Sequence, residues 1–327
     1  MSIKLYSNDS TKSLIKSFIE KGREPHSIAI FGEKGQGKKA MASYIAASLL
    51  CESGKGEPCG KCKSCRMIAQ NVHPDFITAQ ANENGNYTLE TIRSIVSDAV
   101  IKPNESKYKV YLIPDLDRSG NTLIQVQNTL LKLIEEPPDH CIIILTAVSR
   151  DIFLPTILSR VISLNTCPCT SEQSREYLSE SGKYDDESIE KAVLFGEGSI
   201  GRCVDYLENP LFSQAVEIAG NVADSVAAGD EYSALRALFS AESNKEMLKQ
   251  IFLLLEEVFR DSAVITEGIR STIGCLREQS EKIAEQHTAE ECEEFYQSAK
   301  KGLIKLKANA NKSLTINAFI TELFTDR

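Results

Sequence analysis

The sequence has no long apolar run, no apolar leader and no excess of positive charge, and each absence excludes a class of protein. No stretch approaches the roughly 18 consecutive apolar residues that a membrane-spanning helix requires. Residues 1–9 also lack the apolar core of a secretory signal peptide. We therefore expect a cytoplasmic protein without a membrane partner.

Positive charge is scarce relative to negative charge. The chain has 37 basic and 46 acidic side chains, which gives a formal net charge of −9. A generic nucleic-acid binder needs an excess of Lys and Arg to neutralise phosphates. The composition therefore argues against DNA binding by the chain alone, but it leaves room for local basic patches and for a role in a DNA-handling complex.

Short apolar segments alternate with helical patterns in the first half of the 327 residues. We expect strands at 27–31, 75–78, 109–113, 141–146 and 161–164, and helices between them at 38–50, 89–100 and 122–135. Several of these strands are continuously apolar, which is typical of a sheet covered by helices on both faces. The alternation predicts an α/β domain with a doubly wound parallel sheet.

The strand pattern stops after Leu164, and the rest of the chain is helical in pattern. Glycines at 196, 198 and 201 interrupt a first, short helical region. Apolar stripes at 248–258 and 303–323 mark a second, longer one. A chain of this length exceeds one ordinary core, so we expect three domains: an α/β core (1–166), a small helical lid (167–209) and a C-terminal helical domain (210–327).

Four of the ten cysteines lie close together, at residues 51–65. Cys51, Cys59, Cys62 and Cys65 follow the spacing C-x7-C-x2-C-x2-C. Four thiolates at such spacing can close a tetrahedral site around one zinc ion, and a site with four protein ligands is structural. The alternatives are an iron–sulfur cluster and a chance cluster of free thiols. In a cytosolic chain the crowding indicates metal rather than disulfides.

A glycine-rich loop follows the first expected strand. Gly32, Gly35, Gly37 and Lys38 fit the phosphate-loop pattern G-x-x-x-x-G-K, but Lys39 stands where the pattern requires Ser or Thr. In a functional loop that hydroxyl binds Mg²⁺, and a lysine has no oxygen to offer. We expect a degenerate nucleotide site in which ATP and Mg²⁺ are not bound productively. The alternative is that the glycines only preserve the turn from strand to helix.

The order of motifs resembles that of the clamp-loader subunits of bacterial DNA polymerase III, which are members of the AAA+ family. The resemblance rests on the phosphate loop, the four-cysteine insert and the motifs at 73–76, 128–138, 159–160, 198–201 and 309–311. Residues 128–138 are close to the NALLKxLEEPP signature of that family. The resemblance implies an AAA+ core with a zinc module, a lid and a helical collar domain.

Within that family, motor subunits hydrolyse ATP, whereas delta prime subunits are usually non-hydrolysing. Motors carry Ser or Thr at the position of Lys39 and Asp-Glu at the positions of Pro114 and Asp115. They also carry a lid arginine at the position of Gly201, although Arg202 is adjacent. The resemblance therefore favours a delta prime type, with no ATPase activity by itself, as a component of the DNA polymerase III holoenzyme.

Arg160, which follows Ser159, matches the arginine finger of the family. The resemblance implies that this residue acts in trans on the nucleotide of a neighbouring motor subunit. It also implies a hetero-oligomer with gamma/tau motor and delta subunits, and contact through that complex with the sliding clamp and with primer–template DNA. The alternative for Arg160 is a solvated arginine that caps a short helix. The region of Thr146 resembles the sensor of bound phosphate.

Two other functions compete with this interpretation. The first is an ATP-hydrolysing gamma/tau-like motor subunit with divergent magnesium ligands. The second is a helical adaptor that reuses the fold outside replication and has no clamp-loader partners. ATPase measurements on the isolated chain separate the first alternative from a delta prime subunit, and a pull-down with clamp-loader partners tests the second.

Overall fold

The computed structural model describes residues 3–82, 86–269 and 274–324, which divide into two compact units. The first unit comprises the residues up to Gln173 together with Gly198–Gly201. The second comprises Ser174–Glu197 and the residues from Arg202 onward. The expected separation of a lid (167–209) from a C-terminal domain (210–327) stays a prediction.

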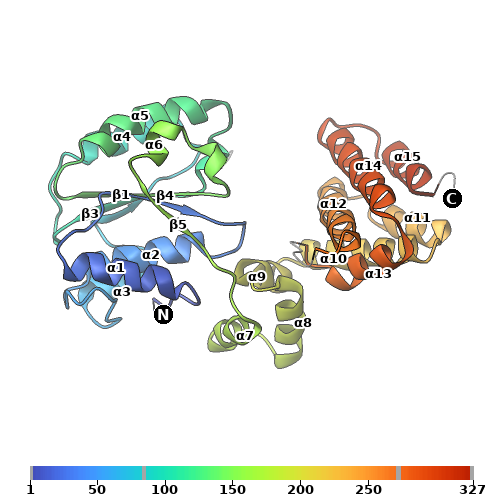
Figure 1. Cartoon of the computed structure of the whole chain (residues 1–327), viewed down its shortest axis with the longest axis horizontal. Helices are drawn as coiled ribbons and strands as arrows, with labels where there is room; N and C mark the ends of the chain where they lie inside the picture. Colours follow the sequence, from blue (N-terminus) through green and yellow to red (C-terminus); the bar gives the residue numbers. More distant parts are fainter. Residues whose placement is uncertain (1–2, 83–85, 270–273, 325–327) are drawn as a thin grey trace. The chain divides into compact units, whose positions relative to one another are not determined.

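The first unit is built on a parallel sheet with the strand order β2-β3-β4-β1-β5. Figure 1 shows this sheet between two layers of helices. Its strands are β1 (Ser27–Phe31), β2 (Phe76–Thr78), β3 (Lys109–Ile113), β4 (Cys141–Ala147) and β5 (Ile162–Asn165). In the central pairings, Ile28 of β1 lies opposite Ile144 of β4 and Ile162 of β5. The expected doubly wound parallel sheet is confirmed.

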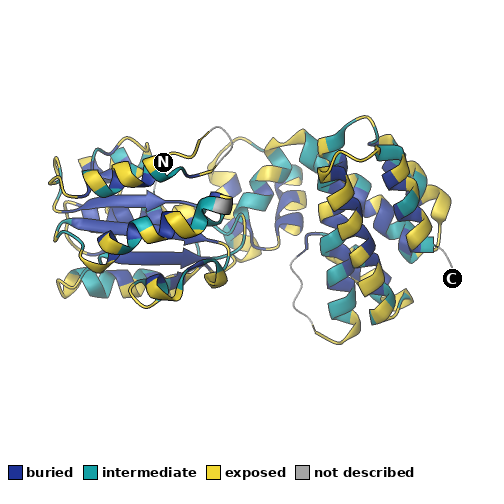
Figure 2. Ribbon diagram, turned by 90° about the horizontal axis from the view of Figure 1, so that it is seen from above, coloured by how far each residue is buried: buried dark blue, intermediate teal, exposed yellow. Residues whose placement is uncertain are grey.

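Helices cover both faces of this sheet. They are α1 (Asp9–Glu20), α2 (Lys38–Leu50), α3 (Lys63–Ala69), α4 (Leu89–Asp98), α5 (Leu123–Glu135) and α6 (Pro155–Leu158), with short 3-10 turns η1 (Leu116–Thr122) and η2 (Arg150–Ile152). Residues that alternate along one strand enter opposite cores: Ile28 and Ile30 pack with α1 and α2, whereas Ala29 and Phe31 pack with α4 and α5. Figure 2 shows the buried sheet between helices with exposed outer faces.

The expected bounds of β1, α2 and β3 are confirmed, whereas the other expected strands and helices differ from the structure by one or two residues at one or both ends. The second strand begins at Phe76 rather than at residue 75, the fourth extends to Ala147, and the helix expected at 89–100 ends at Asp98. Asp75 itself lies just before the strand, and its main-chain oxygen still accepts from the N–H of Val110 in β3 at 2.8 Å.

Asp75 is fully buried and ties the segment that precedes β3 to the start of β2. Its carboxylate accepts main-chain N–H bonds from Asn104 (2.6 Å), Glu105 (2.9 Å) and Ser106 (2.9 Å), and its own N–H donates to Nδ1 of His73 at 3.0 Å. Burial by itself would raise the pKa of Asp75, but these N–H donors reverse the effect and hold the pKa below its ordinary value.

Replacing Asp75 with Asn should destabilise the chain by about 3 kcal/mol at pH 7, because the new amide group would face N–H donors in a buried site. The folded-state pKa of Asp75 is depressed, so its contribution is present above the unfolded pKa of about 3.9 and is lost as the pH falls through the folded value. Urea unfolding of both proteins at pH 7 and near pH 3 should therefore show a smaller difference at the lower pH. Asp139→Asn, at an exposed position, serves as the control. Equal losses of stability in the two variants would contradict the role of Asp75 as an anchor of the segment that precedes β3.

In its described residues the second unit contains helices and no strand. Its helices, two of which begin in the first unit, are α7 (Ser171–Glu180), α8 (Asp186–Gly196), α9 (Ile200–Glu208), α10 (Pro210–Ala227), α11 (Glu231–Ser240), α12 (Lys245–Thr266), α13 (Arg277–Gln286), α14 (Ala289–Lys307) and α15 (Lys312–Phe324). In the described part of the chain, no helix combines the length and the apolar character needed to cross a bilayer.

Helices α12 and α14 pack closely in the centre of this unit. The ring of Phe252 lies 4.7 Å from that of Phe319, and the ring of Phe259 lies 5.2 Å from that of Phe295. A Cβ atom at Gly302 would lie only 2.2 Å from the Phe252 ring, so this close approach requires glycine. The apolar stripe at 303–323 belongs to two helices, because Asn309 adopts a positive φ of 62° and ends α14.

Candidate functional site

The phosphate loop, residues 32–39, lies at the carboxyl edge of the sheet. It leaves β1, and β4 and β3 lie next in order on one side of that strand. The carboxyl ends of parallel strands share one edge, which is where ligands bind in open α/β sheets. Asp115, just after β3, and Thr146, near the end of β4, therefore approach the loop.

The loop has the backbone shape of a phosphate-binding turn. Gly37 is the N-cap of α2 and adopts φ 76° and ψ 24°, a left-handed conformation that disfavours residues with a side chain. Gly35 has a similar φ of 85°. The N-terminus of a 13-residue helix thus follows the loop, as in nucleotide-binding proteins.

Lys38 is buried within the loop. Its Nζ donates to the main-chain oxygens of Gly32 at 2.7 Å and of Glu33 at 3.0 Å. The lysine that would reach the phosphates of a nucleotide is thus engaged with carbonyl groups of its own loop.

Lys39 meets Asp115. Its Nζ lies 3.3 Å from Oδ2 of Asp115, whose side chain is 17% exposed. The main chain of Asp115 is left-handed (φ 49°, ψ 56°), and its N–H donates to Oγ1 of the buried Thr146 at 2.8 Å. The structure therefore joins two of the residues predicted for the degenerate site, and it places an ammonium group beside the carboxylate.

The lid motif contacts the loop through backbone atoms. The N–H of Gly201 donates to the main-chain oxygen of Gly35 at 3.0 Å. A Cβ atom at Gly201 would lie 2.5 Å from Cα of Gly35, so only glycine allows this approach. The neighbouring Arg202, considered as a substitute for the lid arginine, instead pairs with Glu257 of α12 at 3.2 Å.

Arg160 lies after the short helix α6 and is 41% exposed. Its guanidinium donates to the main-chain oxygen of Thr156 at 2.9 Å and to Oγ of Ser159 at 3.0 Å. It also lies 3.1 Å from Oε1 of Glu135. Among the described residues, no hydrogen bond or ion pair joins Arg160 to the phosphate loop, so the two predicted parts of the site are separate within one chain.

The four clustered cysteines converge as their spacing predicts. The sulfur atoms of Cys51, Cys59, Cys62 and Cys65 all lie within 4.8 Å of one another. All ten cysteines of the chain are in the described ranges, and all are free thiols. The cluster can hold a metal ion. In tetrahedral zinc sites with four thiolates, each zinc–sulfur distance is about 2.3 Å.

Main-chain N–H groups donate hydrogen bonds to sulfur atoms of this cluster. The N–H groups of Cys59, Cys62 and Cys65 donate to the sulfur atoms of Cys51, Cys59 and Cys62 at 3.3–3.4 Å. Hydrogen bonds from the main chain at Lys61 and Cys62 lower the pKa of Cys59 to about 6. These donors favour the thiolate at Cys59, whereas burial raises the pKa of Cys65. The convergence of the four sulfur atoms is what fits a metal ion with four cysteine ligands.

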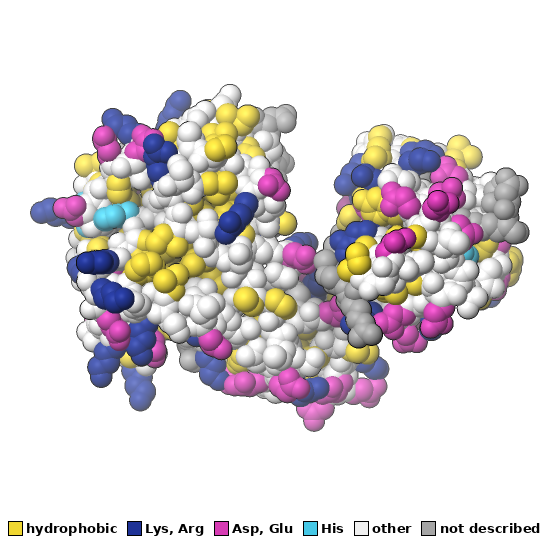
Figure 3. Space-filling view, viewed as in Figure 1, with side chains coloured by type: hydrophobic (Ala, Val, Ile, Leu, Met, Phe, Trp, Pro, Cys, Tyr) yellow, Lys and Arg dark blue, Asp and Glu magenta, His cyan; other side chains and the backbone are white. Residues whose placement is uncertain are grey.

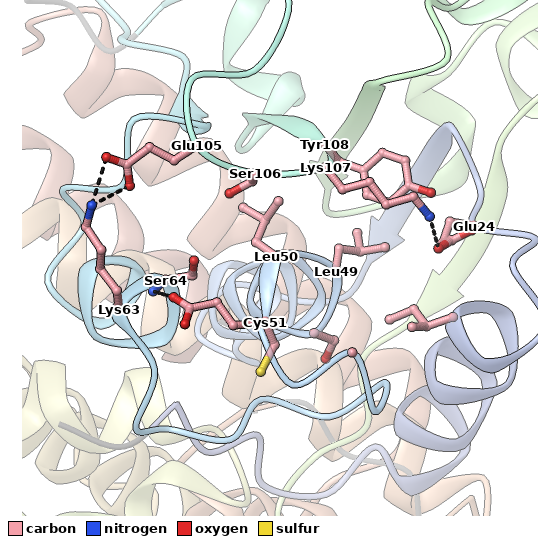
Figure 4. A pocket seen from close by; sticks show the side chains of 14 residues that line it. Glu24, Leu49, Leu50, Cys51, Lys63, Ser64, Glu105, Ser106, Lys107 and Tyr108 are labelled. Carbon is pink, nitrogen blue, oxygen red and sulfur yellow. Dashed lines mark hydrogen bonds and ion pairs between the residues drawn. The ribbon is translucent and has the colours of Figure 1, made fainter.

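A cavity of about 550 Å³ lies where the cysteine module meets the end of α2 and residues 105–108 (Figure 4). At its rim Lys63 pairs with Glu105 at 2.7 Å, and Lys107 pairs with Glu24 at 3.2 Å. The first pair joins the module to the segment before β3, and the second joins that segment to the residues after α1. Figure 3 shows Lys and Arg side chains gathered over the region of α1 and α3, where Lys55, Lys61 and Arg66 are exposed.

Two residues of the site escaped the sequence analysis. Gln36 accepts hydrogen bonds from the N–H of Glu33 and from Oγ1 of Thr166, both at 3.1 Å, and so braces the loop. Glu135 pairs with Arg160. No pattern in the sequence indicates either contact, because each depends on which segments the sheet brings together.

Comparison with known proteins finds similarity to subunits of DNA polymerase III. Residues 7–169 match the family described as "DNA polymerase III, delta subunit". The DNA polymerase III subunit gamma of Buchnera aphidicola (from Acyrthosiphon pisum) is 29% identical over 203 residues, which are 60% of this chain and 55% of that protein. The DNA polymerase III subunit tau of Escherichia coli K12 is 30% identical over 185 residues, 55% of this chain and 28% of that protein.

The match thus spans about half the length of the Buchnera relative and less of the Escherichia one. Among solved structures, a gamma subunit-related protein of DNA polymerase III from Thermotoga maritima is 18% identical, with a TM-score of 0.46 and coverage of 96% of this chain and 98% of that one. The DNA clamp loader delta protein of Bacillus subtilis is 10% identical, with a TM-score of 0.41 and coverage of 96% and 99%.

Proposed function

Because its α/β half belongs to the clamp-loader family of DNA polymerase III subunits, with the AAA+ fold, we propose that this chain is the delta prime-type subunit of a cytoplasmic clamp loader. In that role it does not hydrolyse ATP. It associates with gamma/tau-type motor and delta-type subunits in an assembly that loads a sliding clamp onto primer–template DNA. The four-cysteine module holds one structural zinc ion.

The ion pair between Lys39 and Asp115 is the observation that carries this proposal. A magnesium site at a phosphate loop needs a hydroxyl oxygen at position 39 and carboxylate oxygens after β3. Here Pro114 supplies no carboxylate, and the ammonium of Lys39 lies 3.3 Å from the remaining one, on Asp115. A positive charge at that point repels a divalent cation and satisfies the carboxylate that would bind it.

The contact between Gly201 and Gly35 supports the same conclusion. Where a motor has an arginine that reports on bound nucleotide, this chain has a backbone hydrogen bond of 3.0 Å onto the loop itself. Arg160, by contrast, keeps an exposed guanidinium outside the loop. The chain has thus lost the groups that would act on its own nucleotide and has retained the one that acts on a neighbour's.

The isolated chain should show no ATPase activity that depends on Mg²⁺, because the ligands for the ion are missing. The measurement is phosphate release by the purified chain, with and without Mg²⁺, beside a mixture with a gamma/tau-type motor subunit and clamp. We expect turnover only in the mixture. The control is a mixture in which the phosphate-loop lysine of the motor subunit is replaced by Ala. That mixture should show no turnover. Hydrolysis by the lone chain would overturn the proposal.

An ATP-hydrolysing motor subunit is the second candidate, and the names of the curated relatives favour it, because these are gamma and tau subunits. In that case Asp115 would position the attacking water after Lys39 moves away. The same measurement decides between the two functions, since a motor would hydrolyse ATP without any partner.

A further inference from the structure

Glu135 and Arg160 come from different elements and meet at the end of two helices. Glu135 is the last residue of α5, and Glu136 leaves the helical conformation (φ −129°, ψ 63°) before Pro137 and Pro138. Arg160 follows α6, which packs on α5. The two charged groups are 3.1 Å apart, and each is more than a third exposed, so both are accessible from outside the chain.

The position of Glu135 is unfavourable for the helix itself. A carboxylate in the last turn opposes the helix dipole, which favours cations there, by about 0.3–1 kcal/mol. Departures from such local rules are typical of functional sites. Here the departure places a negative charge beside the one arginine that the proposed function requires.

The carboxylate of Glu135 is one of several groups that hold the guanidinium of Arg160. Nη1 donates to neutral oxygens of the preceding segment, on Thr156 and Ser159, whereas Nη2 faces Glu135. An arginine side chain has many rotamers, and ordering it is unfavourable in entropy. A second anchor from another helix fixes the plane of the guanidinium. The group carries five N–H donors, more than these contacts use, so it can keep Glu135 while it donates to a phosphate.

We propose that Glu135 is a positioning residue for Arg160: it holds the guanidinium in the orientation that meets the phosphate of a nucleotide on the neighbouring subunit. This inference rests on the proposed function of Arg160. Glu135 itself does not touch the nucleotide. Small displacements of a catalytic group lower the rate far more than they lower binding, so its removal acts on kcat rather than on KM.

The test uses the complete clamp-loader complex, with clamp and primer–template DNA, and measures ATP hydrolysis at the site next to this subunit. We expect Glu135→Ala to lower kcat about fivefold, close to the upper limit for an exposed ion pair, with an unchanged KM for ATP. Glu135→Gln, which keeps an acceptor oxygen, should lose about twofold. Glu136→Ala is the matched control, because Glu136 is the adjacent acid and is also exposed. The complex with this substitution should match the unsubstituted one.

A double-mutant cycle shows whether Glu135 acts through Arg160. The variant with both Glu135→Ala and Arg160→Ala should be no slower than Arg160→Ala alone. If the two losses instead multiply, or if Glu135→Ala lowers the melting temperature of the isolated chain, Glu135 has a structural role and the inference fails. Faster turnover of Glu135→Ala would also overturn it, as would an unchanged rate alongside a slow Arg160→Ala. No effect of Arg160→Ala would refute the proposed function itself.

Discussion

Replacing Arg160 with Ala should slow ATP hydrolysis at the adjacent motor site by about 10³-fold, while the chain stays folded. Arginine fingers contribute about 10³–10⁵ in rate to phosphoryl transfer, because they neutralise charge that develops on the transferred phosphoryl group. The side chain is 41% exposed, so its truncation removes little packing. Single-turnover hydrolysis in the assembled complex measures the effect at that one site, whereas steady-state rates also include the other sites.

Arg175 offers a matched control for this experiment. It has the same 41% exposure and also pairs with a carboxylate, that of Glu190 at 2.5 Å. Arg175→Ala should therefore leave the rate unchanged. Arg160→Lys should fall between the two, since it keeps the charge but loses the planar fork of the guanidinium. Equal rates for Arg160→Ala and Arg175→Ala would show that Arg160 is a solvated surface residue.

Loss of one cysteine from the cluster should release the proposed zinc ion and destabilise the first unit by about 5 kcal/mol, a magnitude typical of the loss of a structural metal site. Cys59→Ser is the most informative change. Cys59 is exposed, so serine disturbs little packing there, and the effect reports on metal binding. Metal content by mass spectrometry and urea unfolding give the two readouts.

Cys167→Ser is the control, since Cys167 is equally exposed but lies outside the cluster. It should retain one zinc ion per chain and full stability. Purified chain without zinc would contradict the proposed zinc site, and Cys59→Ser with unchanged stability would contradict a structural role for any metal there.

The sequence was sufficient for those features that depend on local pattern. The continuously apolar strands 109–113 and 141–147 could be recognised because both faces of the sheet are covered. The convergence of the cysteines could be predicted as well, because their spacing closes a small loop. The phosphate loop was recognisable from its glycines, and its left-handed residues, Gly35 and Gly37, are found where glycine is required.

Contacts between distant segments could not be predicted in this way. The pairing of Lys39 with Asp115 depends on the strand order, which puts β4 between β1 and β3, and on the unusual backbone of Asp115. The pairing of Glu135 with Arg160 depends on how α5 and α6 end. Similarly, the sequence indicated a single apolar stripe at 303–323, whereas the positive φ of Asn309 divides it into two helices.

If the chain is the non-hydrolysing subunit proposed above, the approach of Gly201 to Gly35 opposes the return of an arginine at position 201. A single substitution that reintroduced arginine at position 201 would first have to push the loop and α9 apart, because its Cβ would overlap Cα of Gly35 at 2.5 Å. The intermediate would lose stability before it gained any catalytic group. Under the proposed function, regaining magnesium ligands alone would therefore not restore an arginine at position 201.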